Sequence, residues 1–179
     1  MIGNALATLL IGHLIADFPL QTNKIYAWKK AGWPGLALHA FIHMGVTAAL
    51  LIHPWQYGGV LLTLGVLHML TDWGKLHIKS RWETVGFLVD QAVHIGVLYF
   101  LSGLVRPGDV IFPPPVLFAI LAYTTLPALL TFANVLRRDM RRVSTREWGW
   151  VSSEDGVLRL AQMMGWPLVV ILLLVWIGR

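Results

Sequence analysis

The sequence predicts an all-α protein, a polytopic bundle of about six transmembrane helices with both termini on the non-cytoplasmic side. Three observations predict this fold class. Of the 179 residues, 56% are hydrophobic and only 13% are charged, whereas a soluble domain carries about 25% charged residues. Apolar stretches of spanning length recur along the chain, and basic residues gather in every second loop between them. Together they indicate a single membrane domain over residues 1–179.

Six stretches of about 20 mostly apolar residues, the length that crosses a bilayer, follow one another along the chain. No basic leader precedes the first, so we expect it to be a retained helix and not a signal peptide. The second begins at Pro34, and proline suits a first helical turn. A proline-rich segment separates the fourth stretch from the fifth. The predicted spans are 2–19, 35–53, 57–74, 84–102, 112–135 and 157–177.

The basic residues indicate which loops face the cytoplasm. The loops after the first, third and fifth predicted spans hold most of the 14 Lys and Arg, whereas the opposite side holds only Arg106 and Arg179. This asymmetry explains the net charge of +5, so the charge does not indicate nucleic acid as a partner. Membrane lipid is the expected partner, and a homo-oligomer is an open alternative. The residues in the basic loops are Lys24, Lys29, Lys30, Lys75, Lys79, Arg81, Arg137, Arg138, Arg141, Arg142 and Arg146.

Ionisable side chains lie inside the first four predicted spans, where hydrocarbon is expected. An aspartate at the bilayer centre costs about 2.5–3.5 kcal/mol on insertion scales, so these groups need partners. They come in pairs spaced four residues apart, which places both side chains on one face of a helix. The pairs are His13 with Asp17, His39 with His43, His68 with Asp72, and Asp90 with His94.

All four pairs are expected at one depth in the membrane. The first and third spans run toward the cytoplasm and carry their pairs near their ends, whereas the second and fourth run away from it and carry theirs near their starts. At about 1.5 Å per residue, the eight side chains fall within roughly one to three helical turns of the cytoplasmic boundary. Residues 1–102 should therefore form a four-helix part that carries a shared site. Residues 103–179 should add two scaffolding spans and a basic cytoplasmic loop at 136–156.

The shared site has the composition of a metal centre. Imidazole and carboxylate ligands suit zinc, our first choice, as well as iron or manganese, and ligands at i, i+4 on facing helices are usual in helical bundles. A divalent metal ion is therefore the expected cofactor. Because the chain has no cysteine, disulfides, iron–sulfur clusters and thiol catalysis are excluded. The predicted metal ligands are His13, His39, His43, His68, Asp72 and His94.

A metal-dependent hydrolase that acts on a lipid or lipid-linked substrate is the favoured function. A metal ion with an open coordination position lowers the pKa of water toward about 7, and Asp17 or Asp90 is the expected general base. Among the ligands, His39, His43 and His94 are preferred. Three polar side chains near the same layer are expected to orient these groups or the substrate. They are Gln21, Lys75 and Gln91.

Other functions could use the same residues. A cation or proton transporter would use the His/Asp layer as a binding site or relay. A haem protein needs only one histidine on each of two helices, and this leaves the aspartates unexplained. A di-iron redox centre and a scaffold protein with a structural metal ion are the remaining alternatives.

Four motifs in the first hundred residues resemble a known family. They are His-x3-Asp-x3-Gln from His13, His-x3-His from His39, His-x3-Asp-x2-Lys from His68, and Asp-Gln-x2-His from Asp90. Over about residues 5–100, the set resembles the domain-of-unknown-function 3307 family of bacterial polytopic membrane proteins. The resemblance implies an integral, multi-pass protein of the bacterial inner (cytoplasmic) membrane with a shared polar site, and it implies no reaction.

Overall fold

A computed structural model of the chain describes residues 2–77 and 83–143. The regular elements among the described residues are all helices, and the only β-type pairing among these residues is one isolated bridge between Leu51 and Val110. The all-α prediction is therefore confirmed. The predicted sixth span, 157–177, lies outside the described residues.

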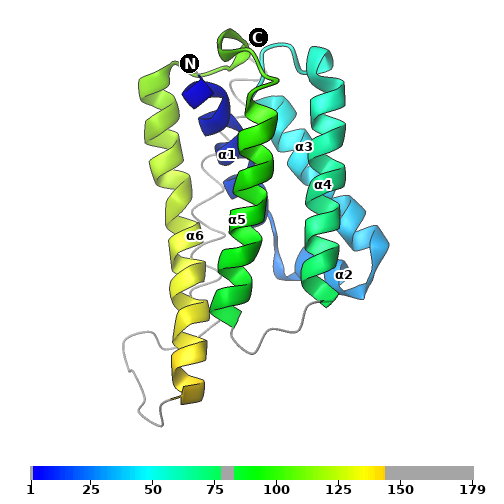
Figure 1. The fold of residues 1–179 in the computed structure, drawn as a ribbon, viewed down its shortest axis with the longest axis vertical. Helices are drawn as coiled ribbons and strands as arrows, with labels where there is room; N and C mark the ends of the chain where they lie inside the picture. The colour runs from blue at the N-terminus through cyan, green and yellow to red at the C-terminus, as the bar shows by residue number, and fades with distance from the viewer. Residues whose placement is uncertain (1, 78–82, 144–179) are drawn as a thin grey trace.

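The five long helices fall at the first five predicted spans. Figure 1 shows them side by side, with α1 behind α5 and α2 near the lower end of α3 and α4. Helix α1 packs against α3, α5 and α6, so it is the central helix of the bundle. The elements are α1 (Ile2–Asp17), α2 (Asn23–Ala31), α3 (Trp33–Ala49), the 3-10 helix η1 (Pro54–Tyr57), α4 (Gly58–His77), α5 (Glu83–Ser102), the 3-10 helix η2 (Pro107–Asp109) and α6 (Pro114–Val143).

The end of the last described helix differs from the prediction. The predicted end of the fifth span at 135 is wrong, because α6 continues to Val143. Residues 136–143 are therefore helical, although they were expected in the basic loop. This stretch lacks Gly and Pro, and arginine favours a helix almost as well as leucine does, so the charged residues extend the apolar helix.

The sequence pattern also did not predict α2. Thr22 caps this helix, since its side-chain oxygen accepts a hydrogen bond from the backbone N–H of Ile25 at 3.3 Å. Gly32 lies between α2 and α3 with a φ angle of 147°, which favours a residue without a Cβ. With Pro34 in the first turn of α3, this glycine ends one helix and starts the next. As a result, α2 folds back and packs against α3.

The apolar core fills mainly the end of the bundle where α1 begins. One cluster of buried side chains joins α1 to the loops at this end and includes Ile11, Leu51 and Val110. A second cluster joins α1 to α4 and α5 and includes Leu9 and Leu64. Near the other end of α1, buried polar side chains such as Asp17 lie among buried apolar ones such as Ile15.

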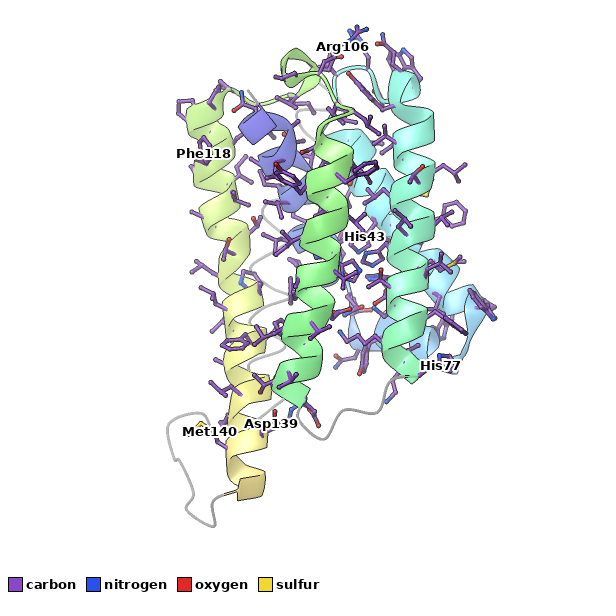
Figure 2. The ribbon with its side chains drawn as sticks, in the orientation of Figure 1. His43, His77, Arg106, Phe118, Asp139 and Met140 are labelled. Atoms are coloured by element: carbon purple, nitrogen blue, oxygen red, sulfur yellow. The ribbon has the colours of Figure 1, made fainter. Side chains whose placement is uncertain are left out.

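The outer surface carries large apolar side chains. Phe41 is 67% exposed and Phe100 is 71% exposed, and Figure 2 shows Phe118 pointing away from the bundle. By length and composition, two of the described helices could cross a membrane, namely Glu83–Ser102 and the Pro114–Met140 part of α6. Only 22% and 17% of their apolar windows are buried. They therefore differ from the core helices of a soluble protein, which are mostly buried.

Asp139 of α6 caps the start of α5. Its buried carboxylate accepts hydrogen bonds from the backbone N–H of Glu83 at 3.2 Å and of Thr84 at 2.7 Å. The first N–H groups of a helix have no partner within it. We therefore expect Asp139→Ala to lower the free energy of unfolding by about 1–2 kcal/mol, measured by thermal unfolding in detergent. Asp139→Asn keeps an acceptor oxygen and should lose less, so equal losses from both variants would contradict this role.

Candidate metal centre

Four helices bring four pairs of ionisable side chains together inside the bundle. Helices α1, α3, α4 and α5 each contribute two residues, and all eight are buried, with exposures between 0% and 8%. Figure 2 shows His43 inside the bundle, whereas His77 and Arg106 lie at opposite ends. The eight residues are His13 and Asp17, His39 and His43, His68 and Asp72, and Asp90 and His94.

Asp17 lies among the histidines. Its Oδ1 atom is 2.9 Å from Nε2 of His39 and 2.9 Å from Nε2 of His43. The Nε2 atom of His68 is 3.6 Å from the same oxygen, and Nε2 of His13 is 3.5 Å from Oδ2. One carboxylate therefore contacts three imidazoles from two helices, α3 and α4, besides its own partner on α1.

Asp72 pairs with a lysine that the sequence pattern did not single out. Nζ of Lys29, on α2, donates a hydrogen bond to Oδ2 of Asp72 at 2.8 Å and to Oε1 of Gln21 at 2.7 Å. The same Asp72 oxygen lies 3.2 Å from Nε2 of His68 and 3.7 Å from Nε2 of His39. Lys29 is 6% exposed, so its ammonium group belongs to the centre and not to a solvated loop.

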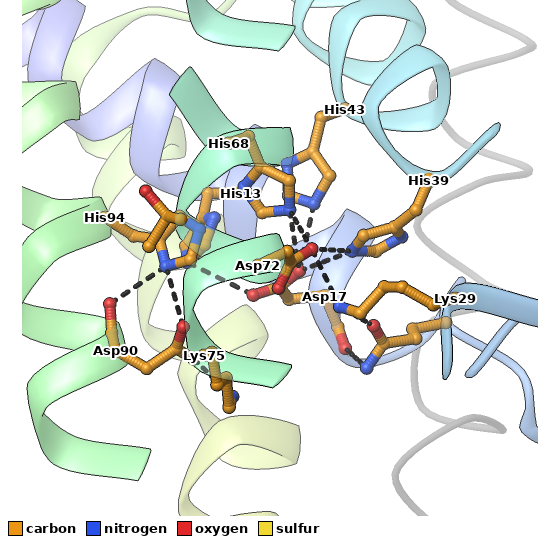
Figure 3. Close-up of polar contacts among 12 residues, drawn as sticks. His13, Asp17, Lys29, His39, His43, His68, Asp72, Lys75, Asp90 and His94 are labelled. Carbon is orange, nitrogen blue, oxygen red and sulfur yellow. Dashed lines mark hydrogen bonds and ion pairs between the residues drawn. The ribbon is translucent and has the colours of Figure 1, made fainter. Parts of the chain in front are cut away.

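A second lysine pairs with Asp90. Nζ of Lys75 lies 2.5 Å from Oδ2 of Asp90, and Nε2 of Gln91 donates to the same oxygen at 3.3 Å. Figure 3 shows these contacts beside those of Asp17 and Asp72. The side chain of Lys75 is 44% exposed, so it joins the buried Asp90 to the surface. The Oε1 atom of Gln91 lies 3.4 Å from Nε2 of His13 and links this side of the centre to α1.

Several imidazole nitrogens in the centre are buried and have no hydrogen-bond partner within residues 2–77 and 83–143. In His94, Nδ1 lies 2.9 Å from the backbone oxygen of Asp90. Donation from Nδ1 leaves Nε2 as the atom with a free lone pair, and this Nε2 is unpartnered. Both ring nitrogens of His68 are unpartnered, as are the Nδ1 atoms of His39 and His43. Buried polar groups usually have partners, so these atoms fit a centre that takes up a further ligand.

Among the residues that the structure describes, the side chains form three ligand groups, in each of which the ligand atoms lie within 4.8 Å of one another. Zinc ligands bind at about 2.0–2.1 Å and so lie roughly 3.4 Å apart in a tetrahedron. Ligand atoms that lie up to 4.8 Å apart would have to move up to about 1.4 Å closer to one another around an ion. The first ligand group is His13, Asp17, His43 and His68; the second is His39, His68 and Asp72; the third is Asp72, Asp90 and His94.

The centre is acidic when its histidines are neutral. Three carboxylates face two lysine ammonium groups, which leaves one net negative charge. A buried charge in a medium of low dielectric needs a counter-charge. A divalent cation would supply that charge and also the missing partners of the imidazole nitrogens.

The structure brings together every residue that the sequence pattern assigned to the site. Of the three predicted orienting residues, Gln21 bonds to Lys29, whereas Lys75 and Gln91 bond to Asp90. The preferred ligands His39, His43 and His94 fall in different ligand groups. His53 and His77 belong to none of the three groups.

Lys29 is the residue of the centre that sequence reasoning missed. It was counted among the basic loop residues because it lies between two predicted spans. A weak signal was present, since Thr22 begins the segment as a good helix cap and Gly32 ends it. A short helix between Thr22 and Gly32 would place residues 25 and 29, which are four apart, on one helical face.

The fold and the centre define a class: an all-helical protein with an apolar exterior that encloses buried His, Asp and Lys side chains. The chain belongs to the family described as "Protein of unknown function (DUF3307)", whose model matches residues 5–109. The matched region contains every residue of the centre, and it confirms the resemblance noted from the motifs. No curated protein and no solved structure matches the chain.

Proposed function

We propose that this chain is a multi-pass membrane protein that binds a divalent metal ion, zinc foremost, and hydrolyses a lipid or lipid-linked substrate. The metal proposal rests on the first ligand group. Its four ligand atoms lie within 4.8 Å of one another, and neither ring nitrogen of His68 has a hydrogen-bond partner among the described residues. Among the described residues, Asp17 pairs with histidines and with no lysine, so its charge remains available to a cation.

The distribution of side chains supports a membrane location. Large apolar side chains face outward and the ionisable ones face inward, as expected where lipid is the solvent. The basic residues of α2 and the basic end of α6 lie at the same end of the bundle (Figure 1). This agrees with a cytoplasmic location for that end, in a bacterial inner membrane.

Hydrolysis is the chemistry that this centre suits best. A divalent metal ion held by His13, Asp17, His43 and His68 would act as a Lewis acid and lower the pKa of water. Asp90 is the candidate general base, because it is buried beside this group and bonds to the half-exposed Lys75. That lysine gives the centre an approach from the end of the bundle where lipid headgroups would lie.

Elemental analysis of the detergent-purified protein tests the metal site. We expect about one equivalent of zinc, iron or manganese per chain, and its loss from His43→Ala and His68→Ala because each removes a ligand of the first group. His53→Ala is the matched control and should keep the metal, since His53 lies outside the centre. A parent protein without metal, purified without chelator and after metal is added back, would show that the proposal is wrong.

The reaction has its own test. The metal-loaded protein is incubated with membrane lipids in H₂¹⁸O, and the products are examined by mass spectrometry. Incorporation of ¹⁸O by the parent but not by His68→Ala would support hydrolysis.

Cation or proton transport is the second candidate. Polar contacts run from Lys75 through Asp90 and Gln91 to His13, which favours a relay. The buried apolar clusters fill the other end of the bundle, which opposes a path through it. Uptake of metal or protons into vesicles, lost in Asp90→Asn, would favour transport over hydrolysis.

A further inference from the structure

Two lysines occupy the carboxylates of the third ligand group. This group consists of Asp72, Asp90 and His94, and it shares no residue with the first group. Lys29 bonds to Asp72 at 2.8 Å and Lys75 bonds to Asp90 at 2.5 Å. Each carboxylate of the third ligand group is therefore already paired with a lysine ammonium group of the chain.

The rest of the third group is built like a metal site. Nε2 of His94 is buried and unpartnered, and the side chain is 3% exposed. Oδ1 of Asp90 is also buried without a hydrogen-bond partner. Each ammonium group therefore binds one oxygen of its carboxylate, while neighbouring ligand atoms of the group have no hydrogen-bond partner in the described part of the chain.

The net charge of the centre favours either the two lysine ammonium groups or a second divalent metal ion, but not both together. Three carboxylates and two lysines leave one net negative charge, which a single divalent ion reverses to one positive charge. A second divalent ion beside both lysines would raise this to three positive charges within the bundle. Uncompensated buried charges of that kind are very unfavourable. Without the lysines, two divalent ions would leave the same single positive charge as one ion does now.

We propose that Asp72, Asp90 and His94 form a second, latent site for a divalent metal ion, which Lys29 and Lys75 close by occupying its carboxylates. This rests on the proposed function, which assigns the first metal ion to the first ligand group. The native chain then holds one metal ion. Lys29 lies on the short helix α2, so a movement of α2 away from α4 would remove one of the two closing charges.

The test is the metal stoichiometry of Lys29→Met/Lys75→Met, measured by elemental analysis after equilibration with manganese or zinc alone. We expect the bound metal to rise from one to two equivalents per chain. Adding His94→Ala to this double variant should return the value to one, because it removes a ligand of the third group only. Lys24→Met/Lys30→Met removes the same charge from exposed positions of α2 and should stay at one.

The outcomes separate this inference from the proposed function. Two equivalents in the parent, or one in the double variant, would overturn the latent site. Zero in both would overturn the proposed metal function and this inference with it. Zero in the parent and one in the double variant, lost on adding His94→Ala, would support the latent site and contradict the first one. If the double variant does not fold, the single variant Lys75→Met is tested instead, because the Lys75 side chain is more exposed than that of Lys29. Lys75→Met should bind a second equivalent of metal more weakly than the first. A value of one equivalent would overturn the inference.

Discussion

Asp17→Asn is expected to abolish metal binding by the first ligand group while leaving the helices in place. Asp17 provides the only carboxylate of this group, and its Oδ1 lies 2.9 Å from both His39 and His43. Asparagine keeps the shape and one acceptor oxygen but removes the negative charge. Loss of groups that merely orient ligands costs about 10–100-fold in metal affinity. We therefore expect a loss of at least about 100-fold for this ligand.

Asp17→Ala should add a loss of stability to the loss of metal. It leaves the buried Nε2 atoms of His39 and His43 without their partner, and each unsatisfied buried group costs about 1–3 kcal/mol. The expected loss is about 2–6 kcal/mol in the free energy of unfolding, measured by thermal unfolding in detergent without added metal. The Asp17→Ala variant should therefore have a clearly lower free energy of unfolding than the Asp17→Asn variant.

Glu83→Gln is the matched control for both variants. It removes the same charge at the start of α5, outside the centre, and it should retain the metal ion. Calorimetric titration with zinc compares the affinities of the three variants with that of the parent. If Asp17→Asn kept the parent's affinity, Asp17 would not be a ligand and the metal ion would have to be reassigned to another group.

Gly35→Ala is expected to be the most destabilising of the small substitutions. A Cβ at Gly35 would lie 2.1 Å from the carbonyl carbon and 2.2 Å from the oxygen of Trp28, and 2.5 Å from the nitrogen of Lys29. These are backbone atoms of α2, so no side-chain rotation relieves the overlap and the helix itself must move. Overpacking usually costs about 1–3 kcal/mol, and we expect the upper end of that range or more.

Gly45→Ala is the control in the same helix. Outside its own helix backbone, no atom of the described part of the chain lies within 4 Å of a Cβ at Gly45, and alanine is favoured over glycine inside a helix by roughly 0.5–1 kcal/mol. This variant should therefore match or slightly exceed the parent in thermal unfolding. If Gly35→Ala were as stable as Gly45→Ala, the close contact between α2 and α3 would be contradicted.

Much of the centre could be predicted from the sequence because it depends on local geometry. The i, i+4 spacing places His68 and Asp72 on one face of a helix whatever the helix packs against. The alternating direction of successive helices then brings four such pairs to one level. All eight residues lie in the centre, and the structure has long helices at the first five predicted positions.

The contacts of Lys29 could not be predicted in this way. Its partner Asp72 lies 43 residues further along the chain, and no local pattern relates the two. The contact requires that α2 turns back at Gly32 and packs closely against α3 beside Gly35. Without that turn, Lys29 would remain one of the basic loop residues, as the sequence pattern suggested.

The division of the cluster into ligand groups was likewise a matter of tertiary structure. Helical spacing predicts which side chains share a face, but it leaves the rotation of one helix against another open, and that rotation selects the imidazoles that meet each carboxylate. The sequence by itself determined the helical class, the apolar exterior and the level of the polar side chains. Only the packing of the helices decided that Asp17 faces histidines while Asp72 and Asp90 face lysines. The physical reason is that periodicity acts within one helix, whereas the pairing of charges depends on distances between helices.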